Sequence, residues 1–235
     1  PSRIRAMDTK QSLAIIALTL LIAAPARAND SAFGGAGGSV APVEDDRIRM
    51  VSEHIKMRLV PKPVDERDDD VVYDTEWRVH ARYVFENTTE QEVELTIGFP
   101  ELACGADNPC PGNSDYSMRE FETTVDGEQV DHRVEQVDQV EGAEDWLDTL
   151  GRVYLFEATF EPGETLEIVH RFEHTPSGSV DGFQANYVTK TGRFWKGTIG
   201  QATFEVRVPH RHYYLAFPRE YELVEREHSR RIGGD

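Results

Sequence analysis

Basic residues are scarce in this 235-residue sequence, which has 25 lysines and arginines against 43 aspartates and glutamates and a formal net charge of −18. Residues 1–28 hold four of the basic residues and one of the acidic residues, so residues 29–235 carry a net charge of −21. Binding to nucleic acid depends on a basic surface. The charge balance therefore argues against a nucleic-acid partner and is typical of a self-repelling exported domain.

Cysteine is nearly absent, with only Cys104 and Cys110 in the segment Cys-Gly-Ala-Asp-Asn-Pro-Cys. Two thiolates provide half of a structural zinc site, and the spacing is not the Cys-x-x-Cys of redox-active pairs. In an exported protein the expected use of such a pair is a local disulfide. We therefore predict a disulfide between Cys104 and Cys110, and we expect no metal and no cofactor.

Long apolar runs are missing too, since Leu13–Ala24 is too short to span a membrane comfortably. Lys10 precedes this run and Ala26-Arg27-Ala28 follows it, which is the pattern of a secretory leader. We expect cleavage after Ala28, a secreted or periplasmic location, and no membrane span once the leader is removed.

The common catalytic signatures are absent. The sequence contains no Gly-x-Ser-x-Gly elbow, and no P-loop lysine follows the glycine-rich residues 29–39. The acidic run at residues 65–70 lacks the glycine and terminal glutamate of an EF-hand. Acidic residues are too numerous to nominate a pair for glycoside hydrolysis. We therefore predict no enzymatic activity and name no catalytic residue.

The eight histidines do not form a recognisable metal site. His170 and His174 lie in a period-two segment, so they are not expected to form the metal-binding pair of a helix. His210 and His212, with His228 or a carboxylate, could hold zinc or copper. We favour exposed histidines without a metal at these positions.

What the sequence has in abundance is alternation of apolar and polar residues, which predicts strands. Such segments occur at residues 50–59, 73–86, 93–99, 121–125, 130–134, 153–160, 165–172 and 202–208, with one or two more within 213–225. Asp126-Gly127 predicts a hairpin, and the turn at Asn87–Gln91 predicts another. Only residues 146–150, before Gly151, favour a short helix. We predict an all-β antiparallel sandwich of about nine strands, immunoglobulin-like or jelly-roll-like.

This pattern divides the chain into four parts. We predict a leader with an upstream extension at residues 1–28, a glycine-rich mature N-terminal segment at 29–47, a β-sandwich domain at 48–228, and a tail at 229–235. Within the N-terminal segment, residues 29–39 are expected to lack regular structure because they are rich in glycine. Asn87-Thr88-Thr89 is a glycosylation acceptor sequence, and we expect it in a short exposed turn.

The segment Tyr187–Gly200 combines strand-forming residues with three bend-forming glycines. Arg193, Trp195 and Lys196 lie between two of these glycines. Large aromatic side chains are mostly buried, so we favour Trp195 as part of the core. The alternative is that Arg193, Trp195 and Lys196 form an exposed binding anchor.

Four motifs extend over most of the chain after the leader. They are Asn29-Asp30-Ser31-x-Phe33-Gly34-Gly35, Met50-Val51-Ser52-Glu53-His54-Ile55, Phe99-Pro100, and Tyr187-x-x-x-Thr191-Gly192-x-x-Trp195-x-Gly197-x-Ile199-Gly200. Together they resemble a family of exported bacterial proteins that is known only as a domain of unknown function. The resemblance implies export and a β-rich fold, and it implies no catalytic residues.

We therefore expect an exported, non-enzymatic β-sandwich that acts as a binding or structural module in the bacterial cell envelope. Its partner would be another envelope protein or a glycan. A carbohydrate-binding module is one alternative, because Trp77, Trp146, Trp195 and eight tyrosines could stack on sugars. A metal-dependent hydrolase is the other alternative.

Overall fold

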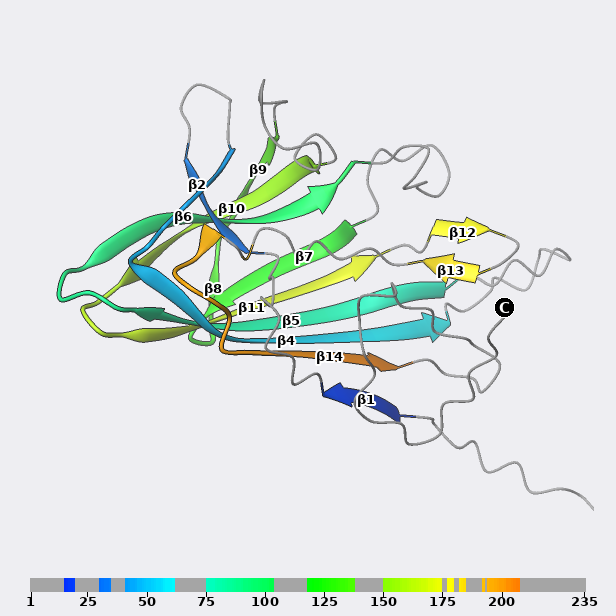
Figure 1. Cartoon of the computed structure of the whole chain (residues 1–235). Helices are drawn as coiled ribbons and strands as arrows, with labels where there is room; N and C mark the ends of the chain where they lie inside the picture. The colour runs from blue at the N-terminus through cyan, green and yellow to red at the C-terminus, as the bar shows by residue number, and fades with distance from the viewer. Residues whose placement is uncertain are drawn as a thin grey trace, which may run out of the picture.

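The structure, a computed structural model, describes residues 15–19, 30–34, 41–61, 75–103, 118–137, 150–174, 177–179, 182–184, 192 and 194–207. Nearly all of this part of the chain is β-strand, and the strands form two stacked layers (Figure 1). The first layer has seven strands in the order β1 (Ile15–Thr19), β14 (Gln201–Arg207), β4 (Ile48–Pro61), β5 (Thr75–Asn87), β11 (Thr165–His174), β7 (Met118–Val125) and β8 (Glu128–Val130).

The second layer has five strands in the order β3 (Ala41–Val43), β2 (Ser31–Gly34), β6 (Val93–Leu102), β10 (Leu150–Phe160) and β9 (Arg133–Gln136). A small separate sheet consists of β12 (Ser177–Ser179) and β13 (Gly182–Gln184). The predicted all-β sandwich is therefore confirmed. The strands outnumber the roughly nine expected because several are short pieces in segments that lack clear alternation.

One pairing departs from the predicted antiparallel arrangement. β14 lies parallel to β4, with Phe204 opposite Ile55, whereas the other strand pairs are antiparallel. Alternation along a strand places its side chains on two faces but does not specify the direction of its neighbour. β1, which lies within the predicted leader, pairs with β14 at the edge of this sheet.

The core lies between the two layers and is built by alternate residues of the long strands. In β5, the side chains of Val79, Ala81, Tyr83 and Phe85 are at most 4% exposed. Across from them, the five-stranded sheet contributes fully buried aromatic rings such as Phe156. Burying one large apolar side chain contributes about 1.5–3 kcal/mol to stability. Burial of the apolar side chains at alternate positions is therefore the main source of stability in this fold.

The predicted hairpin at Asp126-Gly127 is confirmed. β7 pairs with β8 across this turn, with Val125 opposite Glu128. Asp126 and Gly127 have φ angles of 47° and 87°. Positive φ at both central residues is typical of a type I′ turn, which matches the twist of the two strands.

The second predicted hairpin is wrong, because the strands on either side of Asn87–Gln91 belong to different sheets. The Asn87 side chain donates hydrogen bonds to the carbonyl oxygens of Gln91, Phe160 and Glu161. Phe160 and Glu161 lie where the chain leaves β10 for β11. The Asn87 side chain therefore links the connection from β5 to β6 with the connection from β10 to β11, and both connections pass from one sheet to the other. A turn sequence signals a reversal of direction, but not whether the next strand stays in the same sheet.

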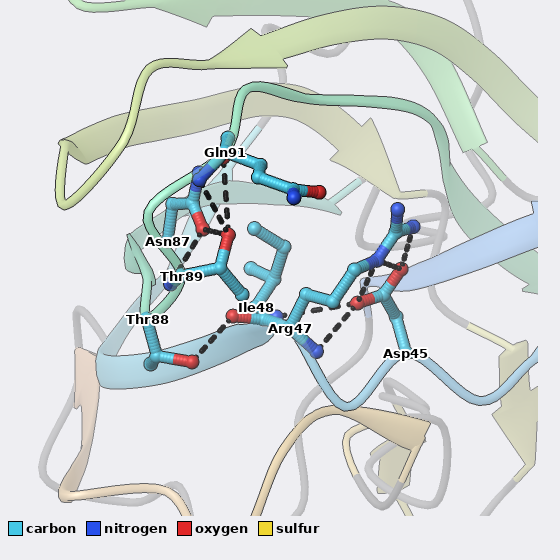
Figure 2. A network of polar contacts seen from close by, with 7 residues as sticks. All are labelled: Asp45, Arg47, Ile48, Asn87, Thr88, Thr89 and Gln91. Atoms are coloured by element: carbon cyan, nitrogen blue, oxygen red, sulfur yellow. Dashed lines mark hydrogen bonds and ion pairs between the residues drawn. The ribbon is translucent and has the colours of Figure 1, made fainter.

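Figure 2 shows how this crossing is connected to the start of β4. The Thr88 hydroxyl donates to the Arg47 carbonyl oxygen over 2.7 Å. The Asp45 carboxylate accepts from the backbone N–H groups of Arg47 and Ile48, and it also pairs with the Arg47 guanidinium. These bonds fix the entry to β4 beside the turn that leaves β5.

Two further expectations are corrected. Leu150 and Gly151 begin strand β10, so Gly151 does not cap a helix; Trp146 lies outside the described residues. The N-terminal segment contributes β2 and β3. β2 lies within residues 29–39, which were predicted to lack regular structure. β2 fits because Gly98 has no side chain: a Cβ there would lie 2.4 Å from the Phe33 ring.

Candidate functional site

Trp195, one of the three residues considered as an exposed anchor, lies in the core. Its side chain is 4% exposed, and its ring centroid lies 4.8 Å from that of Phe85. Its Nε1–H donates a 2.8 Å hydrogen bond to the carbonyl oxygen of Asp30. The core interpretation of Trp195 is therefore confirmed, and its use as an exposed anchor is wrong because the indole is already fully engaged.

Of the other predicted site residues, only Lys196 lies within the part of the chain that the structure describes. Lys196 is exposed, and its ammonium group donates to the Thr88 hydroxyl over 2.8 Å. Arg193, Cys104 and Cys110 lie outside the described residues, so the predicted disulfide stays a prediction. The three histidines considered for zinc or copper, at positions 210, 212 and 228, also lie outside them.

Among the described residues, Asn87 and the tryptophans considered for glycans are buried. Asn87 of the acceptor sequence is fully buried, and its amide is bound by three carbonyl groups. Trp77 is 5% exposed and, like Trp195, belongs to the core. Trp146 lies outside the described residues. The tryptophans that can be placed therefore do not offer rings for stacking on sugars.

A buried polar cluster lies at the centre of the sandwich. Both carboxylate oxygens of Asp30 lie within 3.1 Å of His170 Nε2, and Thr123 Oγ1 lies 2.9 Å from His170 Nδ1. All three side chains are completely buried. Burial raises the pKa of the Asp30 carboxyl group above its ordinary value of 3.8, and His170 opposes this shift without cancelling it.

The order carboxylate, imidazole, hydroxyl is that of a nucleophilic triad, but the surroundings of this cluster are aromatic and closed. The rings of Tyr83, Phe99, Phe121 and Phe156 lie within 5.7 Å of the His170 ring, measured between centroids. A reacting substrate would have no room beside the Thr123 hydroxyl. The cluster instead fastens the N-terminal segment to β7 and β11.

The outer face of the seven-stranded sheet carries a different kind of cluster. Three basic residues lie side by side in register, with Lys56 of β4 opposite His80 of β5, and His80 opposite Arg171 of β11. Glu205 of β14 and Glu122 of β7 occupy the two ends of this row. We call Lys56, His80 and Arg171 the basic row; Figure 1 shows their strands side by side.

More basic side chains flank the basic row on the same face. His54 lies opposite Arg82 on one side, and Arg58 lies opposite Arg78 on the other. A hollow of about 700 Å³ lies over this face and is lined by residues of all five strands from β14 to β7. The outer face of the sheet is therefore strongly basic at its centre, although the chain as a whole is acidic.

Several of these cations lack a carboxylate partner within the part of the chain that the structure describes. Arg82 pairs with Glu167, and Arg78 pairs with Glu76 and Glu173. Lys56, Arg58 and Arg171 take part in none of the ion pairs formed among the described residues.

The surroundings of His80, in the middle of the basic row, lower its pKa. Burial lowers the pKa of His80, and the charges of Arg171, Lys56 and His54 lower it further, against an opposing contribution from Glu167. Lys56 and Arg171, neither of which has an ion-pair partner among the described residues, lie on either side of this imidazole. The arrangement can therefore bind negative charge.

The basic row was not predicted from the sequence, although a signal for it was present. The polar positions of β4 include His54, Lys56 and Arg58, and those of β5 include Arg78, His80 and Arg82. Two successive strands with basic polar faces are unusual in so acidic a chain. Only the pairing of β5 with β11, which is distant in sequence, adds Arg171.

The described part of the chain has no group of three or more histidine, cysteine or acidic side chains arranged to hold a metal ion. Within the same residues, no helix is long and apolar enough to cross a membrane.

A family model described as Domain of unknown function (DUF4424) matches residues 28–153. No curated protein matches the sequence. Among solved structures, the chain is similar to a proposed nutrient binding protein from Legionella pneumophila subsp. pneumophila str. Philadelphia 1, with a TM-score of 0.57 and 23% sequence identity. The match covers 76% of this chain and 55% of that one, and it shows the shared fold alone.

An M1 zinc metallopeptidase from Deinococcus radiodurans matches with 13% identity and a TM-score of 0.33, over 71% of this chain and 33% of that one. This likeness is too distant to carry an argument. The chain thus spans little more than half the length of the first of these proteins and a third of the second.

Proposed function

Because this chain belongs to the DUF4424 family of domains of unknown function, membership supplies no activity, and we propose that it is an exported, non-enzymatic binding module of the cell envelope. Its ligand contacts the outer face of the seven-stranded sheet. The proposal depends on the cations of Lys56, Arg58 and Arg171, which have no ion-pair partner among the residues that the structure describes.

Unpaired like charges on neighbouring strands repel one another and lower stability. Residues that lower the stability of a fold and form no stabilising contact in exchange are typical of functional surfaces. A binding role is also in keeping with the description of the Legionella structure as a proposed nutrient binding protein. The buried cluster of Asp30, Thr123 and His170 does not compete as a site, because its groups are satisfied by one another.

The test compares three immobilised proteins exposed to an envelope extract. They are the unchanged protein, a Lys56→Glu/Arg171→Glu variant, and a Lys196→Glu variant as control for an exposed lysine elsewhere. Bound proteins, glycans and small molecules are identified by mass spectrometry. We expect material that is retained by the unchanged protein and by Lys196→Glu, and lost from the double variant.

Two results would contradict the proposal. Retention of the same material by the double variant would show that the outer face is not the binding surface. Loss of the material from Lys196→Glu alone would return the site to the loop at Arg193 and Lys196. Circular dichroism of all three proteins confirms that each is folded.

Export is tested separately through the mature N-terminus. We propose that the leader is cleaved after Ala28, as its small residues at 26 and 28 favour. N-terminal sequencing of protein recovered from the periplasm should begin at Asn29. A chain recovered only from the cytoplasm, with the leader intact, would contradict export.

A further inference from the structure

We propose that the basic row of Lys56, His80 and Arg171 binds a small oxyanion with two negative charges, such as phosphate or a dicarboxylate. This inference rests on the proposed function and names the ligand class for the same face of the sheet. Four features of the row support it, namely its spacing, its charge, its boundaries and the state of its histidine.

The spacing of the row suits a small ligand. Neighbouring strands lie about 4.8 Å apart, so the backbones at Lys56 and Arg171 are about 10 Å apart with His80 between them. Their long, flexible side chains can converge above the imidazole. A guanidinium offers a fork of N–H donors that matches the two oxygens of a carboxylate or phosphate, and an ammonium adds a point charge.

The positive charge of the basic row favours a ligand with a matching negative charge. Lys56 and Arg171 are both without an ion-pair partner among the described residues, so two positive charges are available. A dianion would neutralise both of them. Single-charge ligands would leave one cation uncompensated, and neutral ligands would leave two.

The boundaries of the row limit the size of the ligand. Glu205 and Glu122 stand at its two ends, where they would repel an anion that extended along the row. The hollow of about 700 Å³ above this face falls within the range of small-molecule sites. A long acidic polymer or peptide would meet these carboxylates, whereas a compact anion would lie between them.

The histidine supplies a readout of binding. Cations on both sides, Arg171 on β11 and Lys56 and His54 on β4, help to lower the pKa of His80, and Glu167 opposes them. A bound anion would reverse this balance and raise that pKa. Because the effects of ligand and proton are reciprocal, a dianion should bind more tightly when His80 is protonated than when it is neutral.

The experiment is isothermal titration calorimetry of the purified full chain with sodium phosphate and, in a second arm, sodium succinate. The same titrations are made with Lys56→Gln, Arg171→Gln and the control Lys196→Gln, after thermal unfolding has confirmed that each variant is folded. We expect at least one anion to bind, with a dissociation constant at least about 10-fold weaker in the first two variants and unchanged in the control. The two arms distinguish a phosphate from a dicarboxylate ligand.

A second measurement follows the His80 ring by NMR across a pH titration. Its pKa should rise when the bound anion is present, and this rise should be lost in Arg171→Gln. No binding of either anion at about 10 mM would overturn the anion site, since sites of this kind bind far more tightly. Equal binding by all variants would also overturn it.

The proposed function can survive this failure. Suppose that neither anion binds, yet the Lys56→Glu/Arg171→Glu protein loses material from the envelope extract. The outer face would then remain a binding surface, and its ligand would be a macromolecule rather than a small oxyanion.

Discussion

Asp30 places a carboxyl group in the centre of the sandwich, out of contact with water. Among the described side chains, His170 is the one that contacts its carboxylate, while its backbone carbonyl accepts from Trp195. Burying a charge is unfavourable unless it is paired and hydrogen-bonded. The stability that this residue contributes should therefore depend on pH.

We expect Asp30→Asn to change this pH dependence. Folding raises the pKa of Asp30 above 3.8, so the folded protein holds the proton more tightly than the unfolded chain. The contribution of this group is fully present below pH 3.8 and is lost as the pH rises through the folded pKa. Urea unfolding between about pH 4 and pH 7 should show the wild type losing stability relative to Asp30→Asn. A constant difference between the two proteins would contradict the raised pKa.

Gly98 is a second position at which neighbouring side chains leave no space for a larger residue. An added Cβ would lie 2.4 Å from the Phe33 ring and 2.6 Å from Val153. We expect Gly98→Ala to lower the free energy of unfolding by about 1–3 kcal/mol through this overlap. In a Phe33→Ala background the penalty should be smaller, because part of the space is then free. Equal penalties in the two backgrounds, measured by urea unfolding, would show that Phe33 is not the obstacle.

At the scale of elements, the junction of β5 and β6 decides how the two layers are connected. Asn87 bonds to the last residues of β10 as well as to its own turn, so one side chain serves two crossings. A hairpin in this place would leave those carbonyl groups without the Asn87 amide.

We expect Asn87→Ala to lower the free energy of unfolding by about 1–3 kcal/mol, because buried carbonyl groups lose their donor. Gln91→Ala is the matched control, since only the backbone of Gln91 takes part in the hydrogen bonds of the turn and its side chain is exposed. That change should stay within about 0.5 kcal/mol. Equal effects of the two substitutions in chemical denaturation would refute the role given to Asn87.

At the scale of the whole molecule, charge is unevenly distributed. The chain has a formal net charge of −18, yet the outer face of its larger sheet gathers basic residues from β4, β5 and β11. Self-repulsion among these residues is opposed only in part by the acidic residues at the edges of the face. Stability and binding should therefore respond in opposite directions to the removal of charge.

We expect Lys56→Gln/Arg171→Gln to leave the free energy of unfolding unchanged or to raise it by up to about 1 kcal/mol, because repulsion is relieved. The gain should shrink at high salt, where the charges are screened. Urea unfolding at low and high salt measures both effects. A loss of more than about 1 kcal/mol would show that these residues support the fold rather than a ligand.

The sequence alone determined the long strands, because side-chain alternation follows from the geometry of each strand without reference to its neighbours. It likewise determined the turn at Asp126-Gly127, where the local backbone conformation selects the residues, and it favoured a buried Trp195. Tertiary structure decided what lies beside each strand. It separated β5 from β6, set β14 parallel to β4, and buried Asp30 against His170.

The basic row shows why local pattern could not supply the rest. Lys56 and His80 come from neighbouring strands in sequence, but Arg171 is added from a distant one, and Glu205 and Glu122 from two more. Alternation assigns each of these residues to a polar face, whereas pairing and register decide which of them share a row. Register is set by how the whole core packs, so the candidate site exists only once the two sheets have formed.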